Sequence, residues 1–247
     1  MNSKIRLIVL DCDGVISSGE AQPFDMSLFS RLAKLNRQSQ YGEAVPAVTL
    51  NTGRPSPYVE AVMQAIDGWQ PALYENGAGM YFPERYQFKT TPLFSQQDKT
   101  ALDEILKRID EKIVQTGKAY WQPGKSICHT LFAQPDYSQS DFAPAVKAII
   151  NSVSNRIVAV PAKLALNIYP AGITKGTGLQ WLSQVTNIPF EEMAGVGDSS
   201  SDVDFLQWVG YPAAPHNATD DVKVVAGYVS TKIDMVGLMD ILDYWQL

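Results

Sequence analysis

Two short segments of the 247-residue chain carry aspartates at spacings that could bind a cation. Asp11 and Asp13 lie two positions apart, and Asp202 follows closely after Asp198. Aspartates two positions apart project to the same side of an extended segment, with their Cα atoms about 6.5–7 Å apart. Like charges at that distance are costly without a nearby cation, and a cluster of oxygen ligands suits Mg²⁺. The four residues therefore predict a magnesium site, with simple turn and capping roles as the alternative.

Other segments could hold the oxygens of a phosphate group. Thr52-Gly53-Arg54 offers a hydroxyl and bare N–H groups after an apolar run, and Asn76 follows another such run. Lys175 lies in a glycine-containing turn at the expected start of a helix, where backbone N–H groups and the helix dipole favour anions. Each segment alone is a weak signal, because many turns contain Thr-Gly or a solvated lysine. Together we expect them to form the phosphate-binding part of the site.

The aspartates, Thr52 and Asn76 follow apolar runs that predict buried strands, and the intervening segments predict helices, one of which begins near Lys175. The expected strands are Ile5–Leu10, Ala44–Leu50, Ala72–Tyr74 and Met193–Val196, and the expected helices are Met26–Asn36, Tyr58–Ile66 and Gly176–Val185. This alternation is typical of an α/β fold. Because open α/β sheets bind ligands beyond the carboxyl ends of their strands, we expect the polar groups to meet in one crevice.

A different pattern of strands and helices in the middle of the chain predicts an inserted α+β unit over residues 82–168. Met80–Leu93 alternates polar and apolar residues as a hairpin does, and later strands lack the spacing of parallel crossovers. The other expected elements are the helices Ser95–Lys118 and Phe142–Val153 and the strands Ile127–Ala133, Arg156–Val160 and Leu164–Tyr169. Residues 1–81 and 169–247 then form a Rossmann-like, doubly wound parallel-sheet core.

Composition excludes several classes of protein. The formal net charge is −6, which argues against binding to the phosphate backbone of nucleic acid. No apolar run is long enough to span a membrane, and the N-terminal segment lacks the pattern of a signal peptide, so we expect a cytoplasmic protein. Cys12 and Cys128 make neither a disulfide framework nor a zinc site. His129 and His216 are isolated, which favours packed or surface roles over metal ligation.

Taken together, the motifs resemble those of the haloacid dehalogenase superfamily of phosphohydrolases, in order and in rough spacing. The matching segments are Asp11-Cys12-Asp13-Gly14-Val15, Thr52-Gly53-Arg54, Lys175-Gly176 and Gly197-Asp198-Ser199-Ser200-Ser201-Asp202. Glu75-Asn76-Gly77-Ala78 looks like the Asn-Gly loop of the Cof-type members. The last motif departs from those members at Ser201, where many of them have Asn. The only stretch long enough for a cap domain lies between Thr52 and Lys175, as in subclass IIB with its type-2 cap. That subclass includes sucrose-phosphate, mannosyl-phosphoglycerate and phosphoglycolate phosphatases.

The resemblance implies a Mg²⁺-dependent phosphatase acting on a small phosphorylated metabolite, a sugar phosphate or a phosphorylated carboxylate. In this family the residue matching Asp11 attacks phosphorus and forms an aspartyl-phosphate, and the residue matching Asp13 acts as acid and base. The resemblance also implies that Mg²⁺ is held by Asp11, the Asp13 backbone carbonyl and Asp198. Asp202 would orient the metal shell or pair with Lys175.

The inserted unit is expected to select the substrate. Its polar and aromatic candidates are Tyr120, Trp121, Lys125, His129 and Lys163, each of which could instead serve packing or the surface. Two alternatives to a phosphatase stay open at this point. One is a phosphomutase of the same superfamily, and the other is a phosphate-accepting binding or signalling module with little turnover.

Overall fold

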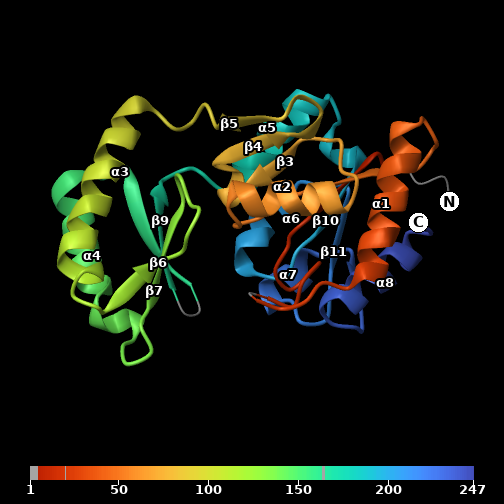
Figure 1. Cartoon of the computed structure of the whole chain (residues 1–247). Helices are drawn as coiled ribbons and strands as arrows, with labels where there is room; N and C mark the ends of the chain where they lie inside the picture. Colours follow the sequence, from red (N-terminus) through yellow and green to blue (C-terminus); the bar gives the residue numbers. More distant parts are fainter. Residues whose placement is uncertain (1–4, 20, 163–164) are drawn as a thin grey trace. The chain divides into compact units, whose positions relative to one another are not determined.

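The computed structural model describes residues 5–19, 21–162 and 165–247, and the chain divides into two compact units. The first unit contains the chain up to Lys89 and from Thr174 onward, and the second is the inserted segment Thr90–Ile173 (Figure 1). Both junctions lie a few residues beyond the limits of 82 and 168 expected from the sequence. The first junction lies later because strands around residues 79–90 pair within the first unit.

A five-stranded parallel sheet forms the centre of the first unit. Its strands are β1 (Leu7–Leu10), β2 (Ala47–Leu50), β10 (Met193–Val196), β11 (Tyr211–Ala214) and β12 (Tyr228–Val229), in the order β12-β11-β10-β1-β2. Leu10 lies opposite Val196 on one side and Leu50 on the other. The residues that follow these three strands therefore reach the same edge of the sheet, as the sequence predicts.

Helices cover both faces of this sheet, which confirms the doubly wound α/β fold. They are α1 (Met26–Gln40), α2 (Ser56–Ala65), α5 (Lys175–Thr186), α6 (Val203–Leu206), α7 (Asp220–Val225) and α8 (Asp234–Tyr244). Successive residues of a strand point to opposite faces. Ile8 and Leu10 accordingly pack in a cluster with α1, α2 and α8, whereas Leu7 and Val9 pack in a second cluster with α5, α6 and α7.

A second, three-stranded sheet extends the first unit beyond β2. It contains β3 (Ala72–Tyr74), β4 (Gly79–Phe82) and β5 (Gln87–Thr90) in that order, and a bridge between Asn51 and Leu73 joins it to the end of β2. The turn between β3 and β4 places Glu75, Asn76 and Gly77 in succession at positive φ. Short 3₁₀ turns lie at Glu75–Gly77, Pro83–Arg85, Gln139–Asp141, Phe190–Glu192 and Ser200–Asp202.

The inserted unit is an antiparallel sheet with two helices on one face. Its strands are β6 (Ala119–Trp121), β7 (His129–Ala133), β8 (Ile157–Pro161) and β9 (Ala165–Pro170), in the order β6-β7-β9-β8. Its helices are α3 (Gln96–Ile109) and α4 (Ala143–Val153), whose buried side chains form a cluster with the sheet. A capping box between Ser95 and Asp98 begins α3.

One expected helix of this unit is shorter than predicted. The apolar stripe predicts helix from Ser95 to Lys118, but α3 ends at Ile109 and a π turn follows over Asp110–Val114. Ile113 stays buried in that turn, so the apolar stripe continues past the end of the regular helix. The strand β6, which the sequence analysis missed, is too short to show a period. Within the described residues, none of the helices has the length and apolar character needed to cross a membrane.

Candidate active site

A buried ion pair between Asp11 and Lys175 lies at the carboxyl edge of the parallel sheet. Asp11 directly follows β1, and its backbone N–H donates to the Val196 carbonyl at 2.9 Å, which fixes it beside the end of β10. Lys175 is the first residue of α5, and only 3% of its surface is exposed. Its Nζ lies 2.9 Å from Asp11 Oδ1 and 2.5 Å from Asp202 Oδ1. The structure thus joins residues from three of the sequence motifs.

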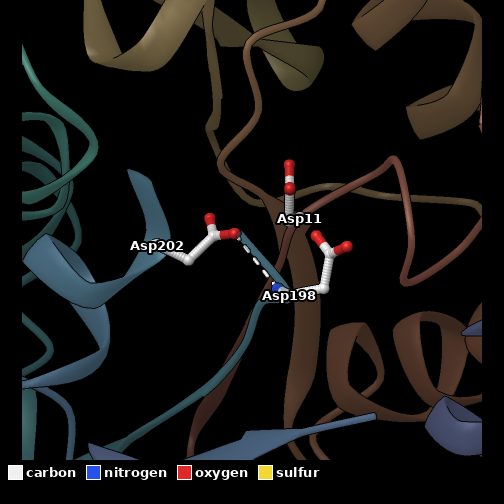
Figure 2. Close-up of side chains that lie close together, drawn as sticks. All are labelled: Asp11, Asp198 and Asp202. Carbon is white, nitrogen blue, oxygen red and sulfur yellow. Dashed lines mark hydrogen bonds between the residues drawn. The ribbon is translucent and has the colours of Figure 1, made fainter. Parts of the chain in front are cut away.

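Three carboxylates, those of Asp11, Asp198 and Asp202, lie close together at this edge, as Figure 2 shows. One oxygen from each of Asp11, Asp198 and Asp202 lies within 4.8 Å of the others. Burial, with the nearby Asp202 charge, raises the pKa of Asp11 to about 7 although Lys175 opposes the rise. Burial, with the Asp11 charge, raises the pKa of Asp198 to about 8. One ammonium therefore leaves the carboxylates under-compensated, and this all-oxygen set fits a hard divalent cation such as Mg²⁺.

Two opposing effects act on the pKa of Lys175, and the effect of its carboxylate neighbours is the larger. Burial alone lowers the pKa of a lysine, but the charges of Asp11 and Asp202 outweigh it and raise the pKa of Lys175. Lys175 is therefore a fixed positive charge at neutral pH.

Asp202 is engaged through both of its carboxylate oxygens. Oδ1 accepts from Lys175, while Oδ2 accepts from the backbone N–H of Asp198 at 3.1 Å and of Ser199 at 2.9 Å. The Ser199 hydroxyl donates to the same oxygen. Asp202 is wholly buried, so these bonds hold the turn that carries Asp198.

Asp13 lies at the more open side of the same edge, and its carboxylate is bound by Arg54. Arg54 Nε donates to Asp13 Oδ2 at 2.7 Å, and Arg54 Nη2 donates to Oδ1 at 2.5 Å. The guanidinium also lies over the Tyr58 ring, 4.8 Å from its centroid. The side chain expected at a phosphate is thus found on Asp13 in this structure.

Thr52, Gly53 and Asn76 lie in two loops that contact each other. Thr52 is 1% exposed, and its carbonyl accepts from the Asn76 N–H at 2.9 Å. A Cβ placed on Gly53 would lie 3.2 Å from Asn76 Oδ1, so the two loops are in close contact. The structure therefore brings the loops after β2 and β3 together, as their strand-end positions predict.

Gly14 and Asn217 complete the surroundings of Asp198. Gly14 has φ +76°, and a Cβ there would lie 2.1 Å from Asp198 Oδ2, so no larger residue leaves that carboxylate in place. Asn217 Nδ2 donates to the Gly14 carbonyl at 3.0 Å and lies 3.4 Å from Asp198 Oδ2. Sequence analysis missed Asn217, because an Asn in a loop far along the chain carries no local signal.

Cys12, between the two aspartates, is a core residue. Its side chain is fully buried, and burial together with the Asp11 charge raises the pKa of its thiol. A thiol that stays protonated is a poor nucleophile.

The candidate residues of the inserted unit lie in different environments. Tyr120 is 45% exposed and stacks on Phe132 with ring centroids 5.5 Å apart. Trp121 packs against the cluster beneath α3 and α4, and its ring lies edge-to-face with His129. Lys163 lies outside the described residues.

Comparisons show which known proteins the chain resembles. A family model described as haloacid dehalogenase-like hydrolase matches residues 122–242. A phosphoglycolate phosphatase of Methanothrix thermoacetophila is 36% identical over 40% of this chain, a match that spans 45% of the relative's length. Phosphoglycolate phosphatase 1 of Saccharolobus solfataricus is 25% identical over 97% of this chain and 95% of its own.

A solved structure from Thermoplasma acidophilum has the same fold over nearly the whole chain. It superposes with a TM-score of 0.74 and 19% sequence identity, covering 98% of both chains. The family model and the full-length relative are both hydrolases by name, and the solved structure shares the fold. These findings are consistent with the acids and the lysine found together at the sheet edge. The chain is therefore similar to the haloacid dehalogenase-like hydrolases, whose family model matches residues 122–242.

Proposed function

We propose that the chain is a Mg²⁺-dependent phosphatase that hydrolyses a small phosphorylated metabolite through an aspartyl-phosphate on Asp11. The phosphatase class is that of the relatives and the hydrolase family. The observation that carries the mechanism is the Asp11 carboxylate, which is buried at the sheet edge in contact with Lys175 and close to two further carboxylates. Such a group is a candidate nucleophile held beside a fixed positive charge.

In the first chemical step, an Asp11 oxygen attacks phosphorus and the bond from phosphorus to the ester oxygen breaks. The departing oxygen takes a proton from Asp13, so an alcohol leaves. In the second step, water attacks phosphorus while Asp13 takes its proton, and the bond from phosphorus to Asp11 breaks. Inorganic phosphate and the original carboxylate result. Lys175, Thr52 and the Gly53 N–H are proposed to hold the phosphate oxygens during both steps.

Asp11 and Asp198, with the Asp13 backbone carbonyl, are proposed to hold the Mg²⁺. The bound ion would neutralise the repulsion between the attacking carboxylate and the phosphate. Asp202 would position Lys175 and the turn that carries Asp198 without binding the ion, because both of its oxygens already accept hydrogen bonds from them. Of the two roles that the sequence leaves open for Asp202, the proposal takes the pairing with Lys175, which the 2.5 Å contact supports.

The substrate is proposed to be a phosphorylated carboxylate or a sugar phosphate, selected by the inserted unit. The first class is that of the substrate in the relatives' names. The sheet of the inserted unit has polar and aromatic groups on the side opposite its helices, including Tyr120, Phe132 and a Thr130–Asn167 hydrogen bond. Phosphate release from a panel of phosphorylated metabolites would identify the substrate.

The test of the class is turnover of p-nitrophenyl phosphate by the wild-type chain with Mg²⁺, with EDTA, and by Asp11→Asn. We expect multiple turnovers with Mg²⁺ only, and none from the variant. Labelling of Asp11 without turnover would indicate a phosphate-accepting module instead. Isomerisation of a sugar phosphate without free phosphate would indicate a phosphomutase.

A further inference from the structure

We propose that Asn51 and Asp204 are positioning residues that grip the peptide bond between Lys175 and Gly176 from its two ends. The grip would fix the Lys175 ammonium against Asp11. This inference rests on the proposed function, because it assigns a reason for holding Lys175 still.

Asn51 holds the carbonyl end of that peptide. Its Nδ2 donates to the Lys175 carbonyl oxygen at 3.0 Å. The residue is wholly buried, and its backbone is anchored because its own N–H donates to the Leu10 carbonyl at 2.8 Å and it bridges to Leu73. Asn51 therefore ties α5 directly to the end of the central sheet, one residue before Thr52.

Asp204 holds the amide end of the same peptide. Its Oδ2 accepts from the Gly176 N–H at 2.8 Å. A Cβ on Gly176 would lie 2.5 Å from that oxygen, so the close approach requires glycine at this position. Asp204 lies two residues after Asp202, so one short segment contacts both the ammonium of Lys175 and the N–H of Gly176 that follows it.

The grip matters because Lys175 begins a helix and carries a long side chain. The first residues of a helix lack intrahelical partners for their N–H groups, and the ends of helices fray. The Lys175 Nζ must nevertheless stay between Asp11 and Asp202. Two side chains that fix its own peptide limit the motion of the Lys175 Cα, and so of the charge it carries.

Asn51 is a poor choice for stability alone. Its Oδ1 is buried and has no hydrogen-bond partner among the residues that the structure describes. An unpaired buried acceptor is costly, so an apolar side chain of similar size would suit the fold better. The amide is useful here for the bond that its Nδ2 donates to Lys175.

The experiment compares Asn51→Leu and Asp204→Ala with the wild-type enzyme, using p-nitrophenyl phosphate with Mg²⁺ and inorganic phosphate as a competitive inhibitor. A misplacement of about 1 Å can cost about 100-fold in rate. We therefore expect each variant to lower kcat about 10-fold and to weaken inhibition by phosphate. Asn51→Leu should keep a melting temperature at or above that of the wild type, because it removes the unpaired acceptor. Asp204→Asn, whose amide oxygen can still accept from Gly176, should restore most of the activity.

Two matched controls separate positioning from stability. Asn36→Leu removes a buried amide that is fully bonded, to Ile66 and Val48, and should lower the melting temperature while leaving kcat unchanged. Asp25→Ala removes a carboxylate that caps α1 through Ser27 and Leu28, and should behave in the same way.

The double variant Asn51→Leu/Asp204→Ala tests whether the two residues act on one peptide. If they do, its loss of kcat should stay near that of the worse single variant, well below the product of about 100-fold. A loss equal to the product would refute the shared grip. Wild-type kcat in both single variants would refute the inference while leaving the phosphatase intact. An inactive wild-type enzyme that also fails to bind phosphate would instead refute the proposed function. Should Asn51→Leu not fold, Asn51→Ala and the two Asp204 variants decide the matter.

Discussion

The guanidinium of Arg54 donates to both carboxylate oxygens of Asp13, from Nε at 2.7 Å and from Nη2 at 2.5 Å. As the proposed acid, Asp13 must carry a proton on one of these oxygens and direct it at the leaving group. For Asp13 to act as the proposed acid, at least one of these bonds must break when substrate binds. The Asp13 side chain is 42% exposed, so it has room to reorient, and Arg54 sets the position from which it starts.

Arg54→Gln should therefore lower kcat about 10-fold, because Asp13 loses the partner that orients it. The loss should be larger for an alkyl phosphate, whose leaving oxygen needs a proton, than for p-nitrophenyl phosphate, whose leaving group departs as an anion. Kinetics with both esters would measure this. Arg37→Gln removes an Arg–Asp pair on the surface of α1 and serves as the control. Equal losses for both esters would contradict a role for Arg54 in proton delivery.

Asp11→Asn should abolish turnover, because an amide of the same shape cannot attack phosphorus. Burial raises the pKa of Asp11 to about 7. At pH 8 the carboxylate is therefore charged, and this buried charge lowers the free energy of unfolding. Without metal at that pH, the variant should melt at the same temperature as the wild type or higher. Steady-state kinetics and a thermal melt test the two parts. More than a few per cent of wild-type kcat would refute Asp11 as the nucleophile.

Metal binding should be linked to pH. The pKa values of Asp11 and Asp198 rise from 3.8 to about 7 and about 8, so the folded protein keeps protons that the unfolded chain has released. Without metal, stability should therefore fall as pH rises from about 4 to about 8. Mg²⁺ must displace those protons at low pH and not at high pH, so it should raise the melting temperature more at pH 8 than at pH 5.5.

Asp198→Asn provides the comparison for this linkage. The variant lacks one of the two carboxylates whose pKa is raised, so its thermal shift with Mg²⁺ should be smaller and should depend less on pH. A wild-type shift that is the same at both pH values would contradict the proposed metal site.

Asp98→Ala should destabilise the inserted unit by about 2–3 kcal/mol, because it removes a helix cap and hydrogen bonds to a charged partner. The carboxylate is 1% exposed, bonds to Arg156 and closes the capping box with Ser95. These bonds, those from Arg156 above all, hold the pKa of Asp98 below its ordinary value. Its contribution is therefore present above about pH 4 and is lost as the pH falls further.

Urea unfolding of the wild type and the variant would measure this loss. Asp141→Ala breaks a capping box of an exposed 3₁₀ turn and should cost less than Asp98→Ala does. Equal losses in the two variants would show that the Arg156 pair adds nothing.

The strand ends of the core were predictable from the sequence, and with them most of the site. Met193–Val196 forms a strand with the predicted limits, because a short apolar run between a 3₁₀ turn and a glycine has few other options. Parallel strands bring their carboxyl ends to one edge, so the meeting of Asp11 with Asp198 follows from topology.

Other contacts were beyond sequence reasoning because they depend on three-dimensional packing. Asn51 and Asp204 act on the backbone of a distant helix, and no residue-type pattern marks such a bond. The pairing of Arg54 with Asp13 depends on how two loops approach each other. The separation of Trp121 and His129 from Tyr120 follows from the alternation of β6 and β7, of which β6 was not expected.

β1 pairs along one side with β2, a near neighbour in sequence, and along the other with β10, which is synthesised only after the whole inserted unit. Until β10 emerges from the ribosome, that side of β1 presents unpaired backbone groups, an arrangement that invites association with other chains. The inserted unit has all its strands in one continuous stretch, so it can fold before the core closes. The pairing of β1 with β10 joins distant parts of the chain and should therefore be slow. Asp11 and Asp198 then meet only when β1 pairs with β10, so the newly made chain brings together its proposed nucleophile and a proposed metal ligand in one late step.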